Sequence, residues 1–345
     1  MKKGCLFIIV ATILFSSMEI SIKLSGSMFN PVQINFLRFF IGGIILLPIA
    51  ISRLKKGNIF LIKRDISFFA LTGFLCIIIS MTFFQLAIVY TKASIVAILF
   101  SCNPVILLIF TSIFLKEKLS TSIIISIFVS LLGIVFIINP FSLSNPLGII
   151  LALMSAISFA AYSVVCRYGT KKYFYDGIVL TVFTFIIGSL ELLGLILISH
   201  IKGVSRFLIS INLNEFANIP VLKGINTGSL PMLLYLGIGV TGIGFCCYFL
   251  AMEEVGVSLS SLIFFIKPAL APIFALIILN EVIHLNTIVG ILIILVGSVI
   301  TFMANLKSSR NNKITDMIIE NDKQLKIWLL VNKVNLLLTI MVNYW

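Results

Sequence analysis

The sequence has few charged residues and few of the residues that build catalytic or metal sites. Asp, Glu, Lys and Arg make up only 11% of its 345 residues, and it contains 2 His and 2 Trp. Soluble domains carry charge at about a quarter of their positions, so this composition excludes an ordinary soluble fold. The 6 Cys lie in apolar stretches without a C-x-x-C pair, which is not a zinc or redox pattern. We therefore expect neither a metal site nor a cofactor.

Long apolar stretches dominate the chain, which is 60% hydrophobic. Ten of them are long enough to cross a hydrocarbon layer, which takes about 20 apolar residues. They are 4–24, 31–52, 66–90, 94–115, 120–138, 147–168, 176–199, 231–252, 258–279 and 286–304. Because lipid cannot satisfy backbone hydrogen bonds, continuous apolar segments of this length form helices. The sequence predicts an all-α, polytopic membrane protein with ten transmembrane helices.

The apolar body contains two copies of one pattern. At an offset of 164 residues, 84–137 aligns with 248–301 without a gap, and 15 of the 54 positions are identical. The first helices of the two halves align at an offset of 144, as in Gly4 and Gly148. Each half thus holds five helices, and an odd number places the second half upside down. Inverted repeats of this kind are typical of secondary transporters.

These offsets divide the chain into a first five-helix repeat at 1–139, a second at 140–304 and a tail at 305–345. The tail is polar and then apolar, with both tryptophans. Its apolar part is short and interrupted by polar residues, which favours an interfacial helix over an eleventh span or a disordered segment.

Basic residues gather in alternate loops. With a cytoplasmic N-terminus, only Lys92 falls in the short outer loops. The cytoplasmic side receives Lys2, Lys3, Arg53, Lys55, Lys56, Lys63, Arg64, Lys116, Lys118, Arg167, Lys171 and Lys172. Because basic loops stay inside, we expect a cell-membrane protein with both termini in the cytoplasm. The net charge of +13 then reflects topology, and we expect no nucleic-acid partner, which would need a clustered basic face.

A G-x-G-x-x-G match at Gly237, Gly239 and Gly242 falls in the middle of an apolar stretch. The dinucleotide-binding pattern has meaning only between a strand and a helix. Close helix packing through small residues is the better interpretation.

Two copies of a longer signature resemble the EamA family of the drug/metabolite transporter superfamily. One runs from Ala87 through Tyr90-Thr91-Lys92-Ala93-Ser94 to Pro104 and Lys116-Glu117-Lys118-Leu119; the other runs from Ala251 through Val255-Gly256-Val257-Ser258 to Lys267-Pro268 and Leu279-Asn280-Glu281. The resemblance covers 4–304. It implies a five-plus-five helix layout and transport of amino acids, metabolites, nucleosides or toxic compounds, without naming the substrate.

Ionisable residues inside apolar spans are the first candidates for a site, because burying charge in a membrane is costly. Glu19 lies in the first span with Lys23 one turn later, and Arg38 lies at similar depth in the second. We expect a Glu19–Arg38 or Glu19–Lys23 pair, serving either as a structural tie or in substrate binding or ion coupling. Glu191 in the seventh span is a second carboxylate with weaker context.

The second group of candidates lies around two matching prolines. Asn103-Pro104 and Lys267-Pro268 occupy equivalent positions, where proline frees a backbone carbonyl. The freed carbonyls would line a substrate cavity, or the prolines would serve packing alone. Further candidates for the cavity lining are Gln85, Tyr90, Tyr162 and Tyr248. We expect Lys267 to face the cavity and contact an acidic part of the substrate.

Two function classes remain. The first is a secondary transporter exporting a small metabolite or amino acid by alternating access, with the bilayer, a small-molecule substrate and a proton or ion gradient as partners. The alternative is a membrane-embedded enzyme acting on lipid-linked substrates, which would need clustered His, Asp or Arg in cytoplasmic loops. A structural subunit would not need charges at mid-span. The sequence leaves the oligomeric state open.

Overall fold

The computed structural model describes residues 2–304 apart from 117–119, 139–145, 174 and 261. The expected tail at 305–345, Glu117 and Lys118 lie outside the described residues. The described part is all-helical, with no strand among these residues. Nine helices are long and apolar enough to cross a membrane, and Thr121–Ile137 is a shorter apolar helix. These helices confirm the prediction of a polytopic α-helical membrane protein.

The described helices follow the expected spans in order. They are α1 (Lys2–Ser16) and α2 (Met18–Ser25); α3 (Pro31–Lys56); α4 (Lys63–Gly73), the π-helix η1 (Phe74–Met81) and α5 (Thr82–Tyr90); α6 (Ala93–Ser101) and α7 (Asn103–Phe114); α8 (Thr121–Ile138); α9 (Pro146–Tyr173); α10 (Gly177–Ile198); α11 (Lys202–Ser210) and the 3-10 turn η2 (Asn214–Phe216); α12 (Leu230–Leu234), the π-helix η3 (Tyr235–Ile243) and α13 (Gly244–Val255); and α14 (Val257–Ser260) and α15 (Leu262–Leu279). The helix Leu285–Ala304 is the last one described.

Local sequence explains where these helices start and bend. At the start of α3, the Asn30 side chain accepts hydrogen bonds from the backbone N–H groups of Val32 and Gln33, and Pro31 occupies the first turn. A polar cap followed by proline is a strong helix start. The first span bends at Ser17, between α1 and α2, so Glu19 lies in the first turn of a new helix.

The two matching prolines have different effects on their helices. Pro104 stands at the second position of α7, directly after a break at Cys102. Pro268 lies inside α15, which continues through it. The predicted disruption therefore occurs in the fourth span, whereas in the ninth span α15 is helical on both sides of Pro268.

Close glycine contacts interlock the two halves. A Cβ on Gly73 of α4 would lie 2.6 Å from the Gly188 Cα of α10, and a Cβ on Gly237 of η3 would lie 2.8 Å from the Ile41 Cγ2 of α3. Gly73 and Gly237 are equivalent at the 164-residue offset. In each half, the third span therefore packs against the second span of the other half, as expected for small residues at membrane helix contacts.

The first helices of the two halves also make equivalent contacts. Gly4 of α1 packs against Val255, and Gly148 of α9 packs against Thr91. Gly4 and Gly148 correspond at the 144-residue offset, and Thr91 and Val255 correspond at the 164-residue offset. Both sequence offsets therefore recur in the packing.

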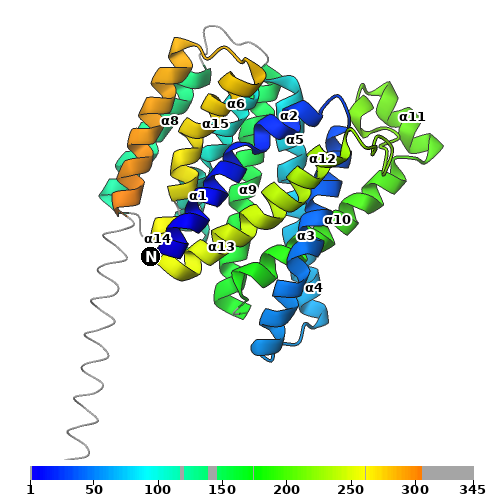
Figure 1. Ribbon diagram of the computed structural model, residues 1–345, viewed down its shortest axis with the longest axis horizontal. Helices are drawn as coiled ribbons and strands as arrows, with labels where there is room; N and C mark the ends of the chain where they lie inside the picture. Colours follow the sequence, from blue (N-terminus) through cyan, green and yellow to red (C-terminus); the bar gives the residue numbers. More distant parts are fainter. Residues whose placement is uncertain (1, 117–119, 139–145, 174, 261, 305–345) are drawn as a thin grey trace, which may run out of the picture.

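One pair of helices packs at the edge of the bundle away from α11 (Figure 1). A Cβ on Gly133 of α8 would lie 2.6 Å from the Ile294 Cγ1 of helix Leu285–Ala304. The hydroxyl groups of Ser126 and Thr301 share a hydrogen bond across the same contact. Gly133 is equivalent to Gly297, so the contact joins the fifth helix of one half to the fifth of the other.

Two glycines of α10 provide a matched test of the interlock. Gly188 touches the backbone of Gly73, whereas a Cβ on Gly194 would meet nothing within 4 Å. We expect Gly188→Ala to lower the unfolding free energy by about 1–3 kcal/mol because the helices must move apart. Gly194→Ala should leave it unchanged or raise it slightly. Thermal unfolding in detergent measures both, and equal effects of the two variants would contradict the proposed close contact.

Candidate substrate site

A cavity of about 530 Å³ lies inside the bundle. Its lining extends from Arg38 and Lys267 to Arg167 near the end of α9 and Thr181 near the start of α10. The cavity therefore reaches toward the end of the bundle where Lys3, Arg53 and Lys56 lie, which we call the basic face. A volume of this size fits a small-molecule ligand.

Aromatic residues are the largest group in the cavity wall. They are Phe15, Phe39, Phe100, Phe159, Tyr162, Phe185, Phe245, Tyr248, Phe249, Phe264 and Phe265. The charged side chains lining the cavity are Arg38, Arg167 and Lys267, and no Asp or Glu appears in the lining among the residues that the structure describes. The wall is thus aromatic and basic.

A buried ion pair joins the two halves beside this cavity. Lys267 Nζ of α15 lies 2.6 Å from Glu19 Oε1 of α2, and the two side chains are 3% and 0% exposed. The carboxylate accepts no further hydrogen bond from the described residues. Lys267 Nζ also lies 5.5 Å from the centre of the Phe100 ring. Each charge therefore depends on the other for compensation, because a single buried charge is costly.

Glu19 forms a direct ion pair with neither expected partner: Arg38 acts on it only from a longer distance, and Lys23 makes contacts elsewhere. Lys23 turns to the end of α5, where its Nζ donates to the Ile88 carbonyl at 2.6 Å and to the Thr91 carbonyl at 2.9 Å. Carbonyls at a helix C-terminus lack intrahelical partners and attract cations. Arg38 makes no ion pair within 4 Å with a described carboxylate, so Lys267 from the other half compensates Glu19.

Arg38 is buried in a setting that offers it few acceptors. Its side chain is 1% exposed, its Nη1 and Nη2 lie 3.2 Å from the sulfur atoms of Met18 and Met81, and its Nε has no partner among the described residues. The guanidinium carbon lies 4.3 Å from the centre of the Phe39 ring. Thioether sulfur is a weak acceptor, so most of the donor capacity of Arg38 is unused.

Five of the other expected site residues lie in or beside the cavity. Asn103, Pro104, Tyr162 and Tyr248 line it. Asn103 also donates through Nδ2 to the Ala156 carbonyl at 3.3 Å. Pro268 is buried next to Lys267 in α15 but does not line the cavity.

Four expected site residues lie elsewhere. Tyr90 donates to Glu215 in the segment after α11, with 2.8 Å between the oxygens. Gln85 and Lys23 line a second cavity of about 230 Å³ between α2, α3 and α5, and both polar atoms of the Gln85 amide lack partners among the described residues. Glu191 is half-buried on α10 and does not line the main cavity.

The end of the bundle opposite the basic face is closed by polar contacts between the halves. The Glu281 carboxylate accepts the backbone N–H groups of Ala93 at 2.8 Å and Ser94 at 3.1 Å, and the Ser94 hydroxyl at 2.6 Å. It therefore caps the N-terminus of α6, where a negative charge is favourable. Lys92 Nζ donates to the Val282 carbonyl at 2.8 Å.

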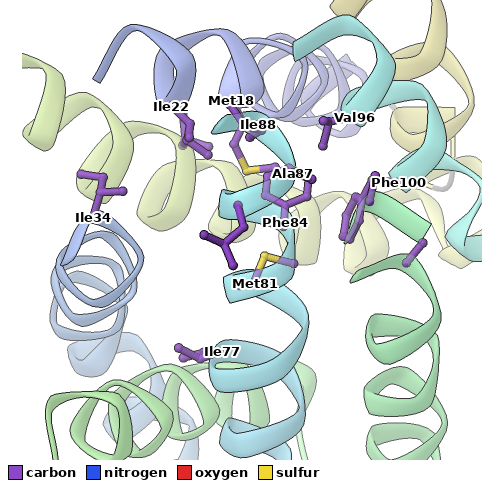
Figure 2. Close-up of a cluster of buried hydrophobic side chains, with 14 of the residues drawn as sticks. Met18, Ile22, Ile34, Ile77, Met81, Phe84, Ala87, Ile88, Val96 and Phe100 are labelled. Atoms are coloured by element: carbon purple, nitrogen blue, oxygen red, sulfur yellow. The ribbon is translucent and has the colours of Figure 1, made fainter. Parts of the chain in front are cut away.

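An apolar cluster separates the main cavity from that closed end. Figure 2 shows Met81, Phe84, Ala87 and Ile88 on one continuous helical stretch, with Met18 and Phe100 beside them. Phe84 and Ala87 are 0% exposed. The cavity is thus continuous toward the basic face and blocked on the other side.

The sequence reasoning missed most of this wall. The sequence pattern does not distinguish these phenylalanines from other apolar residues of the spans, and Arg167 enters the sequence analysis only among the charges that set topology. Arg167 lies at the end of the sixth span and corresponds to Lys23, a site candidate, at the 144-residue offset. That correspondence was the available signal that Arg167 belongs to the site. Among the described residues, no three His, Cys, Asp or Glu side chains gather as a metal site would require.

Comparison with known proteins agrees with this architecture. The profile of the EamA-like transporter family matches residues 2–139 and 146–303. An uncharacterized transporter of Clostridium kluyveri is 35% identical over 326 residues, covering 92% of this chain and 98% of its own length. The pseudopaline exporter CntI of Pseudomonas aeruginosa is 24% identical over 168 residues, covering 48% of this chain and 57% of its own. A crystal structure with 16% identity has a similar fold, with a TM-score of 0.56, and covers 87% of this chain and 96% of its own.

Proposed function

The chain belongs to the EamA-like transporter family, and we propose that it is a secondary transporter that exports a small metabolite or amino acid by alternating access of two inverted repeats. The observation that carries the proposal is the buried Glu19–Lys267 pair beside a cavity of about 530 Å³. Burying charges at this depth costs free energy, and buried charges in membrane proteins mark substrate or ion pathways. Export is the direction named for the CntI relative.

The arrangement of open and closed ends supports alternating access. With the N-terminus in the cytoplasm, the basic face is cytoplasmic, and the cavity lining extends toward it. The opposite end is closed by Glu281 on α6 and by the apolar cluster of Figure 2. The structure would then represent the state open to the cytoplasm, in which a substrate for export binds.

Glu19 is the proposed coupling residue. A proton arriving on its carboxylate would cancel the charge that compensates Lys267, so the ion pair between α2 and α15 would weaken. That change alters the contact between the halves at the cavity, where alternating access must act. The enzyme alternative needs a cluster of metal or phosphate ligands, and the described residues bring no such metal-ligand group together.

The inverted topology is tested by labelling single cysteines in intact cells. Lys118 follows the fourth span, and Asn280 follows the ninth span. In the 164-residue alignment Asn280 corresponds to Lys116, two residues before Lys118. We expect a membrane-impermeant maleimide to label Asn280→Cys from outside, and Lys118→Cys only after the membrane is opened. Labelling of Lys118→Cys from outside would reject the inverted arrangement.

Transport is tested by counterflow of pooled metabolites in liposomes, with three variants at equal protein. Glu19→Gln and Lys267→Met each leave a buried charge unpaired, which costs about 3–5 kcal/mol, so both should lower thermal stability. The double variant removes both charges and should recover most of that stability. We expect it to remain inactive, or to transport without responding to an imposed pH gradient.

The wild-type protein should transport at least one component of the pool. Wild-type transport by the double variant, with unchanged response to a pH gradient, would show that the pair is only a structural tie. No transport of any component by the wild type would count against the transporter itself.

A further inference from the structure

The two cations deep in the main cavity are compensated differently. Lys267 has Glu19 at 2.6 Å. Arg38 is equally buried, yet its terminal nitrogens contact only the Met18 and Met81 sulfurs, and its Nε has no partner among the described residues. A guanidinium has five N–H donors in a planar fork that matches a carboxylate. Arg38 is therefore a buried cation that no carboxylate among the described residues contacts directly.

The rest of the cavity offers no counter-charge to Arg38. No Asp or Glu lines it among the described residues, and Glu19, whose charge acts on Arg38 from a longer distance, makes its direct ion pair with Lys267. The wall is therefore basic around Arg38, and a cationic ligand would meet unfavourable charge there. An anionic ligand would supply the missing compensation.

We propose that the cavity binds an organic anion with a single carboxylate and an apolar or aromatic body, and that Arg38 is the residue that binds the carboxylate. The assignment rests on the proposed transport function and narrows its substrate class. It also moves the expected anion contact from Lys267, which is already paired, to Arg38. Lys267 then serves the contact between the halves.

The methionine contacts suit such a site. A carboxylate oxygen is a much stronger acceptor for a guanidinium than a thioether sulfur, and charge-assisted bidentate pairs are among the strongest polar contacts in proteins. Met side chains are unbranched and adaptable, so Met18 and Met81 can withdraw from Arg38 at small cost. In the absence of a ligand, the two sulfurs keep the guanidinium in place.

The aromatic wall accounts for the apolar body of the ligand. Phe39 lies under the guanidinium, and Phe100, Phe159 and Tyr162 form a continuous run, with ring centres 5.2 Å apart at each step. Such rings pack well on a planar or aliphatic ligand. A cavity of about 530 Å³ accepts a metabolite-sized molecule.

A binding role and a structural role for Arg38 predict opposite stabilities. A buried cation without a counter-ion destabilises the ligand-free protein, and function can require such a cost. Arg38→Met, which fits among Met18 and Met81 and has no charge, should therefore unfold at the same or a higher temperature than the ligand-free wild type. A structural role predicts a lower temperature or failure to accumulate.

The ligand class is tested by thermal unfolding of the purified full chain with matched probes that differ in one group. One series is indole-3-acetate, indole-3-acetamide and tryptamine, and the other is hexanoate, hexanamide and hexylamine. Bound ligand raises the unfolding temperature according to its affinity. We expect the acid of at least one series to bind about tenfold or more tightly than its amide and its amine.

The variants assign that preference to Arg38. Arg38→Met should weaken acid binding by about 10- to 100-fold, the loss of charge-assisted hydrogen bonds, and leave amide binding unchanged. Arg38→Lys keeps the charge but loses the planar fork of donors. Its affinity for the acid should lie between the affinities of the wild type and of Arg38→Met. Lys55→Gln removes the same charge from an exposed position on α3 and should bind like the wild type.

Three results would overturn the assignment. They are acids that bind no better than their amides and amines in both series, an Arg38→Met variant that keeps the preference for acids, and an Arg38→Met variant that fails to fold. Transport in liposomes is scored separately. Acid binding without any transport would leave this site standing and reject the transporter, whereas transport without a preference for acids would reject this site alone.

Discussion

A charge inside a hydrocarbon layer is costly to leave uncompensated, and the Glu19–Lys267 contact compensates two such charges inside the bundle. Its two members come from α2 and α15, far apart in the chain, and the Nζ–Oε1 distance is 2.6 Å. The bend at Ser17 places Glu19 at the start of a new helix. The pair ties a helix of the first half to one of the second, so the position of the cavity depends on it.

The glycine contacts give the halves a geometry in which this pair can form. Gly73 meets Gly188, and Gly237 meets Ile41, at distances that leave no room for a side chain. The second and third spans of opposite halves therefore interlock, while the first and ninth spans remain free to face each other beside the cavity. Large apolar side chains cover the outside of the bundle, as contact with lipid requires. Close packing and the buried Glu19–Lys267 pair thus have separate roles.

The helices could be predicted from sequence because a span across the bilayer needs a continuous apolar segment of about 20 residues. Close packing at Gly237 could be predicted because small residues in apolar spans mark helix contacts. The partner of Glu19 could not be predicted, because it depends on which helix of the other half lies opposite. Reasoning within one half favoured Lys23 and Arg38, whereas Lys23 bonds the carbonyls at the end of α5. Tyr90 and Gln85 also lie outside the main cavity, because Tyr90 ends α5 and bonds Glu215, and Gln85 lines the smaller cavity.

The central claim is that Glu19 and Lys267 compensate each other directly, and exchanging their charges tests it. Accumulation of monodisperse protein is measured for Glu19→Lys, for Lys267→Glu and for the exchange of both, with Lys55→Glu, a charge reversal at an exposed position near the end of α3, as a control. Each single reversal places two like charges together in a buried site, so both should accumulate poorly, and the exchanged protein should accumulate close to the wild-type level. An exchanged protein that accumulates no better than the worse single variant would contradict the pairing.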